Sequence, residues 1–168
     1  LEGFTALGAS RDADRVRRRL RDLGVSAPRR ARGRPSYGDR LSPRELDVVR
    51  LLQARFGHVD SERVFSGPGL MNLYQALCEL RGVQPRWHAP VDLVDAAEEG
   101  SDLLAAECVA LFCRWLGSFA GDLALTFRAR SVCLAGGLTG HLGRYLRQGG
   151  FMQRFLDKGV LSETLREV

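Results

Sequence analysis

A length of 168 residues allows one domain or slightly more, and 45% hydrophobic with 27% charged residues is typical of a globular chain. No run approaches the roughly 20 apolar residues of a membrane span, so we expect no membrane segment and a cytoplasmic location. The net charge of +5 is uneven, because residues 1–40 hold eleven arginines against five acidic residues, whereas residues 41–168 hold fourteen Lys and Arg against fifteen.

The N-terminal 40 residues are expected to form a basic helix and a linker. Asp12 to Leu23 is predicted to be helical and to end at Gly24, so residues 1–23 form the first of three regions. Residues 24–40 are rich in Arg, Pro and Gly, which indicates a mobile linker, and residues 41–168 form the third region. The arginines favour either weak, sequence-independent attraction to nucleic-acid phosphates or a solvated helix face followed by a basic linker.

The third region opens with a well-marked helix over residues 43–56. Ser42 is a good N-cap, Pro43 suits the first helical position, and Glu45 completes a capping box. Gly57 ends the helix. Its predicted buried stripe consists of Leu46, Val49, Leu52 and Phe56.

Two further helices are predicted after a Gly-Pro-Gly break. A short helical turn over Ser61 to Val64 leads into Ser66-Gly67-Pro68-Gly69. A helix from Leu70 to Leu80 follows, and its apolar face is Leu70, Leu73, Leu77 and Leu80. The longest helix spans about Ser101 to Phe127, with apolar residues at steps of three and four. Gly117 and Gly121 each cost up to about 1 kcal/mol relative to alanine, so we expect another backbone to approach them closely.

The only predicted β element is Ser131 to Ala135, a short apolar run that enters the turn Gly136-Gly137 before a helix beginning at Leu138. A strand, a glycine turn and a helix are typical of phosphate and nucleotide sites. The fold class is therefore mostly α with a short β element.

The cysteines indicate neither a metal centre nor a disulfide framework. They contain no C-x-x-C pair and have no histidine at ligand spacing, so we expect buried free thiols. The four positions are Cys78, Cys108, Cys113 and Cys133.

The segment 57–70, GHVDSERVFSGPGL, resembles bacterial glucokinase, as does NLYQAL at 72–77. The resemblance continues through LFC at 111–113, AGDLAL at 120–125, LAGG at 134–137 and the closing segment 151–159. It covers about residues 44–168 and implies the C-terminal part of the large domain of a hexokinase/actin-like α/β fold. The family phosphorylates glucose to glucose 6-phosphate with ATP and Mg²⁺.

The resemblance assigns roles to a few residues of this chain. Glu62 corresponds to the carboxylate that hydrogen-bonds sugar hydroxyls, and Ser66, Gly67, Pro68 and Gly69 shape the loop beneath it. Gly136 and Gly137 correspond to the adenosine-binding turn, although Leu138-Thr139-Gly140-His141 departs from the family's Ile-Val-Pro-Arg. No catalytic or metal-binding residue is assigned.

The family's Asp-x-Gly-Gly-Thr-Asn, Asn-Asp and Glu-Gly-Gly-His motifs do not occur in this sequence. We therefore expect a kinase fragment, truncated and inactive alone, with glucose and ATP as the partners that the family implies.

Residues 1–52 have a second resemblance, to the linker and first DNA-binding helix of LuxR-type regulators, carried by GASRDADRVRRRL at 8–20 and LSPRELDVVRLL at 41–52. The recognition helix that must follow is missing. Either the chain joins regulator to kinase sequence, or the 43–56 helix belongs to the kinase-like part. The alternative functions are therefore a regulator fragment and a non-catalytic interaction module that self-associates through exposed apolar faces.

Overall fold

The computed structural model describes residues 41–148 and 150–168, and these lie in one unit that extends from Tyr37 to Val168. The predicted helix from Asp12 to Leu23 and the predicted linker at 24–40 lie outside the described residues. The elements are mostly helical, as predicted, and run in this order: α3 (Pro43–Phe56), α4 (Gly67–Arg81), α5 (Pro90–Glu99), α6 (Leu103–Phe127), α7 (Gly143–Gln148), α8 (Phe151–Leu156), the 3₁₀ turn η1 (Gly159–Leu161) and α9 (Ser162–Leu165).

Helix α3 begins as its sequence predicts. The Ser42 side chain accepts a hydrogen bond from the backbone N–H of Glu45, and the Glu45 carboxylate accepts one from the N–H of Ser42 at 2.7 Å. The predicted buried stripe is partly wrong, because Leu46 is exposed and α3 instead buries Val48, Leu52 and Glu45. The buried face therefore keeps Leu52 and is shifted toward Glu45 and Val48, by about one sixth of a turn at 3.6 residues per turn.

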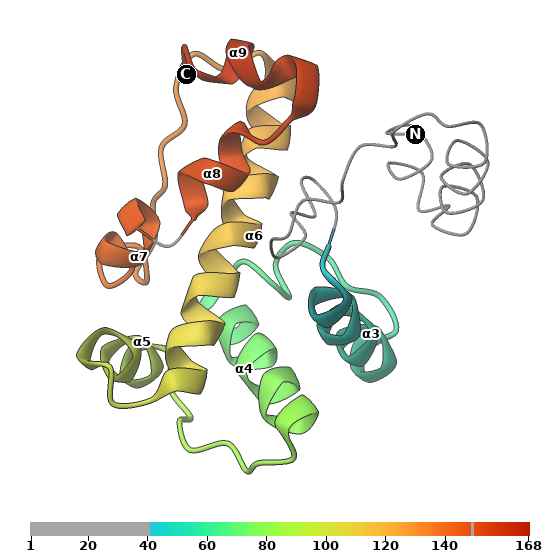
Figure 1. The fold of residues 1–168 in the computed structure, drawn as a ribbon, viewed down its shortest axis with the longest axis vertical. Helices are drawn as coiled ribbons and strands as arrows, with labels where there is room; N and C mark the ends of the chain where they lie inside the picture. The colour runs from blue at the N-terminus through green and yellow to red at the C-terminus, as the bar shows by residue number, and fades with distance from the viewer. Residues whose placement is uncertain (1–40, 149) are drawn as a thin grey trace, which may run out of the picture. The chain divides into compact units, whose positions relative to one another are not determined.

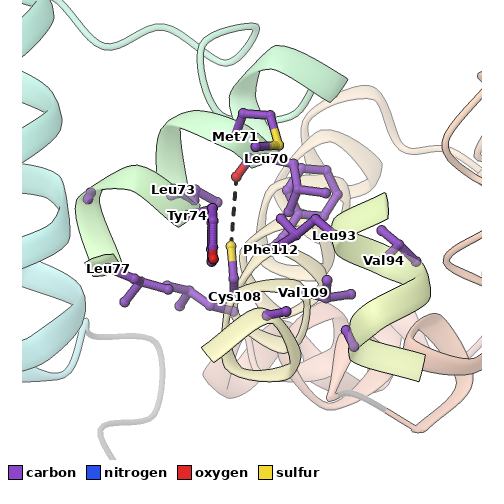
Figure 2. Packing of buried hydrophobic residues seen from close by; sticks show 14 of the residues in the cluster. Leu70, Met71, Leu73, Tyr74, Leu77, Leu93, Val94, Cys108, Val109 and Phe112 are labelled. Atoms are coloured by element: carbon purple, nitrogen blue, oxygen red, sulfur yellow. Dashed lines mark hydrogen bonds between the residues drawn. The ribbon is translucent and has the colours of Figure 1, made fainter. Parts of the chain in front are cut away.

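Helix α6 is the central element of this part of the molecule, and α4, α5 and α8 pack along it (Figure 1). Leu70, Leu73 and Leu77 of α4 are fully buried against it, each stabilising the fold by about 2 kcal/mol. Leu80, predicted to share this face, is half exposed near the end of α4. Figure 2 shows the thiol of Cys108 on α6 donating to the carbonyl of Leu70 at 3.7 Å.

Two glycines of α6, Gly117 and Gly121, allow another segment of backbone to approach the helix closely, as the sequence predicts. A Cβ at Gly117 would overlap the backbone carbonyl of Phe151, and one at Gly121 would lie 2.5 Å from the carbonyl oxygen of Phe155. Both carbonyls belong to α8, so the short helix lies directly on the α6 backbone. Lys158 then fixes the chain after α8, since its Nζ pairs with Asp122 at 2.7 Å.

Helix α6 is also long and apolar enough to cross a membrane, by length and composition only. Mostly buried helices in the core of globular proteins have the same length and composition. The residues that α6 buries against its neighbours include Cys108, Val109, Phe112 and Ala120. Packing within the domain therefore accounts for its apolar character.

A buried carboxylate joins three helices. One oxygen of Glu45 in α3 accepts hydrogen bonds from Trp115 Nε1 of α6 at 3.1 Å and from Arg154 Nη2 of α8 at 3.3 Å. Burial by itself raises the pKa of Glu45, but the hydrogen bonds from Ser42 and Trp115 and the charge of Arg154 outweigh it, so the pKa lies below its ordinary value.

Three further expectations need correction. Ser131 to Ala135 is irregular, and no strand occurs among the described residues, because a lone apolar segment has no neighbouring strand to pair with. Ser61 to Val64 forms a turn rather than helix. Cys133 is exposed, whereas Cys78, Cys108 and Cys113 are buried free thiols as predicted. Burial raises the pKa of Cys113 to about 12, which keeps its thiol protonated.

Candidate functional site

A cavity of about 200 Å³ lies where the start of α4 meets the segment between α6 and α7. Two segments predicted to be functional, about 70 residues apart in the sequence, both contribute to its wall: Ser66-Gly67 and Gly136-Gly137. The rest of the lining is Phe65, Phe112, Leu116, Leu134, Ala135, Leu138, Thr139, Leu142 and Leu146. The fold therefore brings the predicted loop and the predicted glycine turn to one site.

The α4 side of the cavity is built around Ser66. Its hydroxyl caps α4 by accepting from the Gly69 N–H at 2.9 Å, and it donates to the Glu62 carbonyl at 2.6 Å. A Cβ on Gly69 would lie 2.5 Å from the carbonyl oxygen of Val64, so this glycine is required by close packing. Pro68 occupies the first turn of the helix, where its missing N–H costs nothing.

Glu62 lies on the turn that precedes α4, and it is exposed and does not line the cavity. Hydrogen bonds hold the backbone of this turn on both sides. Arg63 donates its N–H to the Asp60 carboxylate at 2.8 Å, and its carbonyl accepts from the Asn72 side chain at 3.1 Å. Asn72 belongs to α4, so Glu62 is carried on a turn fixed to the helix that forms the cavity wall.

The opposite wall is the glycine turn. Gly136 has φ +136°, a conformation that side chains rarely adopt, and its carbonyl accepts from the Thr139 N–H at 3.1 Å. The predicted order of strand, glycine turn and helix is only partly realised, because turns occupy 137–142 and the helix begins at Gly143 rather than Leu138. A Cβ at Gly137 would meet no atom within 4 Å, so this glycine faces open space.

The aromatic part of the lining was not predicted as a site. Phe65 packs against Phe112 edge-on at 6.3 Å and stacks with Phe119 at 4.9 Å between ring centroids. Phe112 and Leu116 stand four apart on α6 and follow the steps of three and four that predicted this helix. Nothing in the local sequence distinguishes a residue of a cavity wall from a residue of a core face.

The cavity suits part of the cofactor that the resemblance implies. Its apolar and aromatic walls, with backbone groups at both glycine segments, fit an uncharged aromatic ring. Its lining contains no carboxylate, and the described residues include no group of three or more His, Cys, Asp or Glu that would hold a metal ion. The residues therefore fit a nucleobase, and they do not fit Mg²⁺.

Known proteins with similar sequences include glucokinases. A glucokinase from Saccharophagus degradans is 41% identical over 125 residues, which cover 74% of this chain and 39% of the relative. One from Chromobacterium violaceum is 41% identical over 126 residues, covering 74% of this chain and 36% of the relative. The chain thus spans less than half the length of these relatives.

The fold agrees with the sequence comparison. The crystal structure of a glucokinase from an Antarctic psychrotroph superposes with a TM-score of 0.70 at 29% identity, over 79% of this chain and 43% of that one. The glucokinase family model matches residues 39–168 and so includes α3. This favours the interpretation that the 43–56 helix belongs to the kinase-like part. Since the match takes in more than half of the sequence, the chain belongs to the glucokinase family.

Proposed function

We propose that this chain supplies the adenine-side wall and the sugar-binding carboxylate of a glucokinase-type ATP:glucose phosphotransferase, and that the 168-residue chain alone does not phosphorylate glucose. The observation that carries the proposal is the cavity shared by Ser66-Gly67 and Gly136-Gly137. Relatives that are about 40% identical bear the name glucokinase.

The side chains at each position suggest which part of the chain would bind the nucleobase and which would bind the sugar. The cavity holds the nucleobase between Phe65, Phe112 and the glycine turn, and the Glu62 carboxylate accepts hydrogen bonds from sugar hydroxyls. Phosphoryl transfer depends on positioning and on stabilising charge at the transferred group. The motifs that supply the general base and the phosphate contacts in the family are not in this sequence. Losing a general base alone commonly costs about 10² to 10⁴ in rate.

The test separates binding from turnover. Calorimetry on the purified chain should detect ATP binding, weakened about tenfold by Ala135→Trp, which fills the cavity, since each tenfold change corresponds to about 1.4 kcal/mol. Ser131→Trp is the matched control, because Ser131 is exposed on the same segment and does not line the cavity. Equal binding by both variants would place the nucleotide elsewhere.

Turnover is followed in a coupled assay for glucose-dependent ATP consumption. We expect none above background from the chain alone. Consumption that disappears in Glu62→Ala would show that the catalytic groups are present, and the proposal of an inactive chain would then be wrong.

A further inference from the structure

The cavity wall contains one side-chain hydroxyl that is not used by the fold. Among the described residues that line the cavity, only Ser66 and Thr139 carry a side-chain oxygen or nitrogen. The Ser66 hydroxyl accepts from the Gly69 N–H and donates its proton to the Glu62 carbonyl. Within the described part of the chain, the Thr139 hydroxyl forms no hydrogen bond. Thr139 can therefore both donate to and accept from a molecule in the cavity.

The backbone fixes the position of this hydroxyl. The Thr139 N–H donates to the Gly136 carbonyl at 3.1 Å, and the Thr139 carbonyl accepts from the Leu142 N–H at 3.2 Å. Leu142 is buried in the main hydrophobic core, so the turn that carries Thr139 is anchored there. The hydroxyl oxygen lies 3.8 Å from the point that a Cβ of Gly136 would occupy. It is thus held beside the glycine turn, on a residue that is partly buried.

We propose that the Thr139 hydroxyl hydrogen-bonds the 6-substituent of a purine base in this cavity, and so selects nucleotides whose base carries a polar group at that position. The inference rests on the proposed function. A base held between apolar and aromatic walls loses water from its polar edge, and a polar group that loses water without gaining a partner weakens binding. Thr139 is the lining side chain that can supply this partner.

The chemistry of a hydroxyl sets the specificity. A hydroxyl rotates, so it accepts from an amino group and donates to an oxo group. Adenine carries a 6-amino group and hypoxanthine a 6-oxo group, and the cavity should bind both alike. An unsubstituted purine has neither group and leaves the hydroxyl without a partner. A nucleotide with that base should bind about five- to tenfold more weakly.

Calorimetry on the full chain tests this with ATP, inosine triphosphate and purine riboside triphosphate. Thr139→Val keeps the branched shape and removes the hydroxyl, so it should weaken the first two about five- to tenfold and leave the third unchanged. Thr139→Ser keeps the hydroxyl and should bind ATP within about twofold of wild type. Thr126→Val is the matched control, because Thr126 is exposed on α6, donates to the Asp122 carbonyl and does not line the cavity.

The response of the three nucleotides separates a contact to the base from a structural role of Thr139. Equal weakening of all three by Thr139→Val, no weakening of ATP, or rejection of inosine triphosphate by the wild-type chain would each overturn the inference. So would a Thr139→Ser variant that binds ATP as weakly as Thr139→Val. Circular dichroism melts establish that the variants are folded.

Failure of this inference is distinguishable from failure of the proposed function. If Ala135→Trp weakens ATP binding and Thr139→Val does not, the nucleotide occupies the cavity and the role of Thr139 is wrong. If the wild-type chain binds no ATP, the proposed function is contradicted and the inference falls with it.

Discussion

At the scale of single residues, Glu45 is the charged side chain that the described part of the fold buries most deeply. Replacing it with alanine removes charge-assisted hydrogen bonds to Trp115 and Arg154, and should lower the free energy of unfolding by about 2 kcal/mol. Glu79→Gln is the control, because Glu79 forms an exposed pair with Arg55 at 3.3 Å that contributes well under about 1 kcal/mol. Urea denaturation measures both changes.

The pH dependence of this stability follows from the lowered pKa of Glu45. Its folded-state pKa lies below the ordinary value of 4.5, so its contribution is present above that value and is lost as the pH falls through the folded pKa. In Glu45→Gln this part of the acid dependence should disappear. An acid unfolding curve identical to wild type would mean that Glu45 is not charged in the folded protein.

At the scale of elements, the close contact between α6 and α8 predicts whether replacing a glycine of α6 with alanine raises or lowers the stability of the fold. Alanine at an exposed helix position in place of glycine stabilises by up to about 1 kcal/mol. At Gly117 the new Cβ would overlap the Phe151 carbonyl, and forcing backbones apart costs about 1 to 3 kcal/mol. We therefore expect Gly117→Ala to lower the melting temperature. Gly137→Ala, whose Cβ meets nothing within 4 Å, should leave it unchanged; a rise in Gly117→Ala would disprove the close packing.

The elements that the sequence predicted correctly are those specified by local chemistry. Ser42, Pro43 and Glu45 mark the start of α3 because capping uses adjacent residues, and the apolar period of three and four residues marks α6. The strand at 131–135 failed because a strand depends on a partner that is distant in the sequence. The burial of Glu45 was missed for the same reason, since Trp115 and Arg154 lie 70 and 109 residues away.

The residues of the candidate site also fall into two groups, those that a local motif identified and those that depend on the tertiary arrangement. Ser66, Gly67, Gly136 and Gly137 were identified from motif resemblance, and the structure places them around one cavity. The position of Glu62 outside that cavity and the aromatic wall from Phe65 and Phe112 depend on how α4 crosses α6, which no local pattern reports. Their roles in binding remain predictions.

At the scale of the whole molecule, charge is segregated along the chain, with eleven arginines against five acidic residues in 1–40 and a near balance in 41–168. Phosphate contacts by arginine release counterions, so affinity falls steeply with salt and ignores sequence. We expect weak retention on a DNA column at about 50 mM salt that is lost by about 200 mM, with equal affinity for duplexes of unrelated sequence. Replacing Arg15, Arg17, Arg18 and Arg19 with serine should abolish retention. Changing the exposed residues Arg130, Arg144, Arg147 and Arg166 instead tests total charge, and equal loss in both variants would show that the N-terminal arginines have no special part.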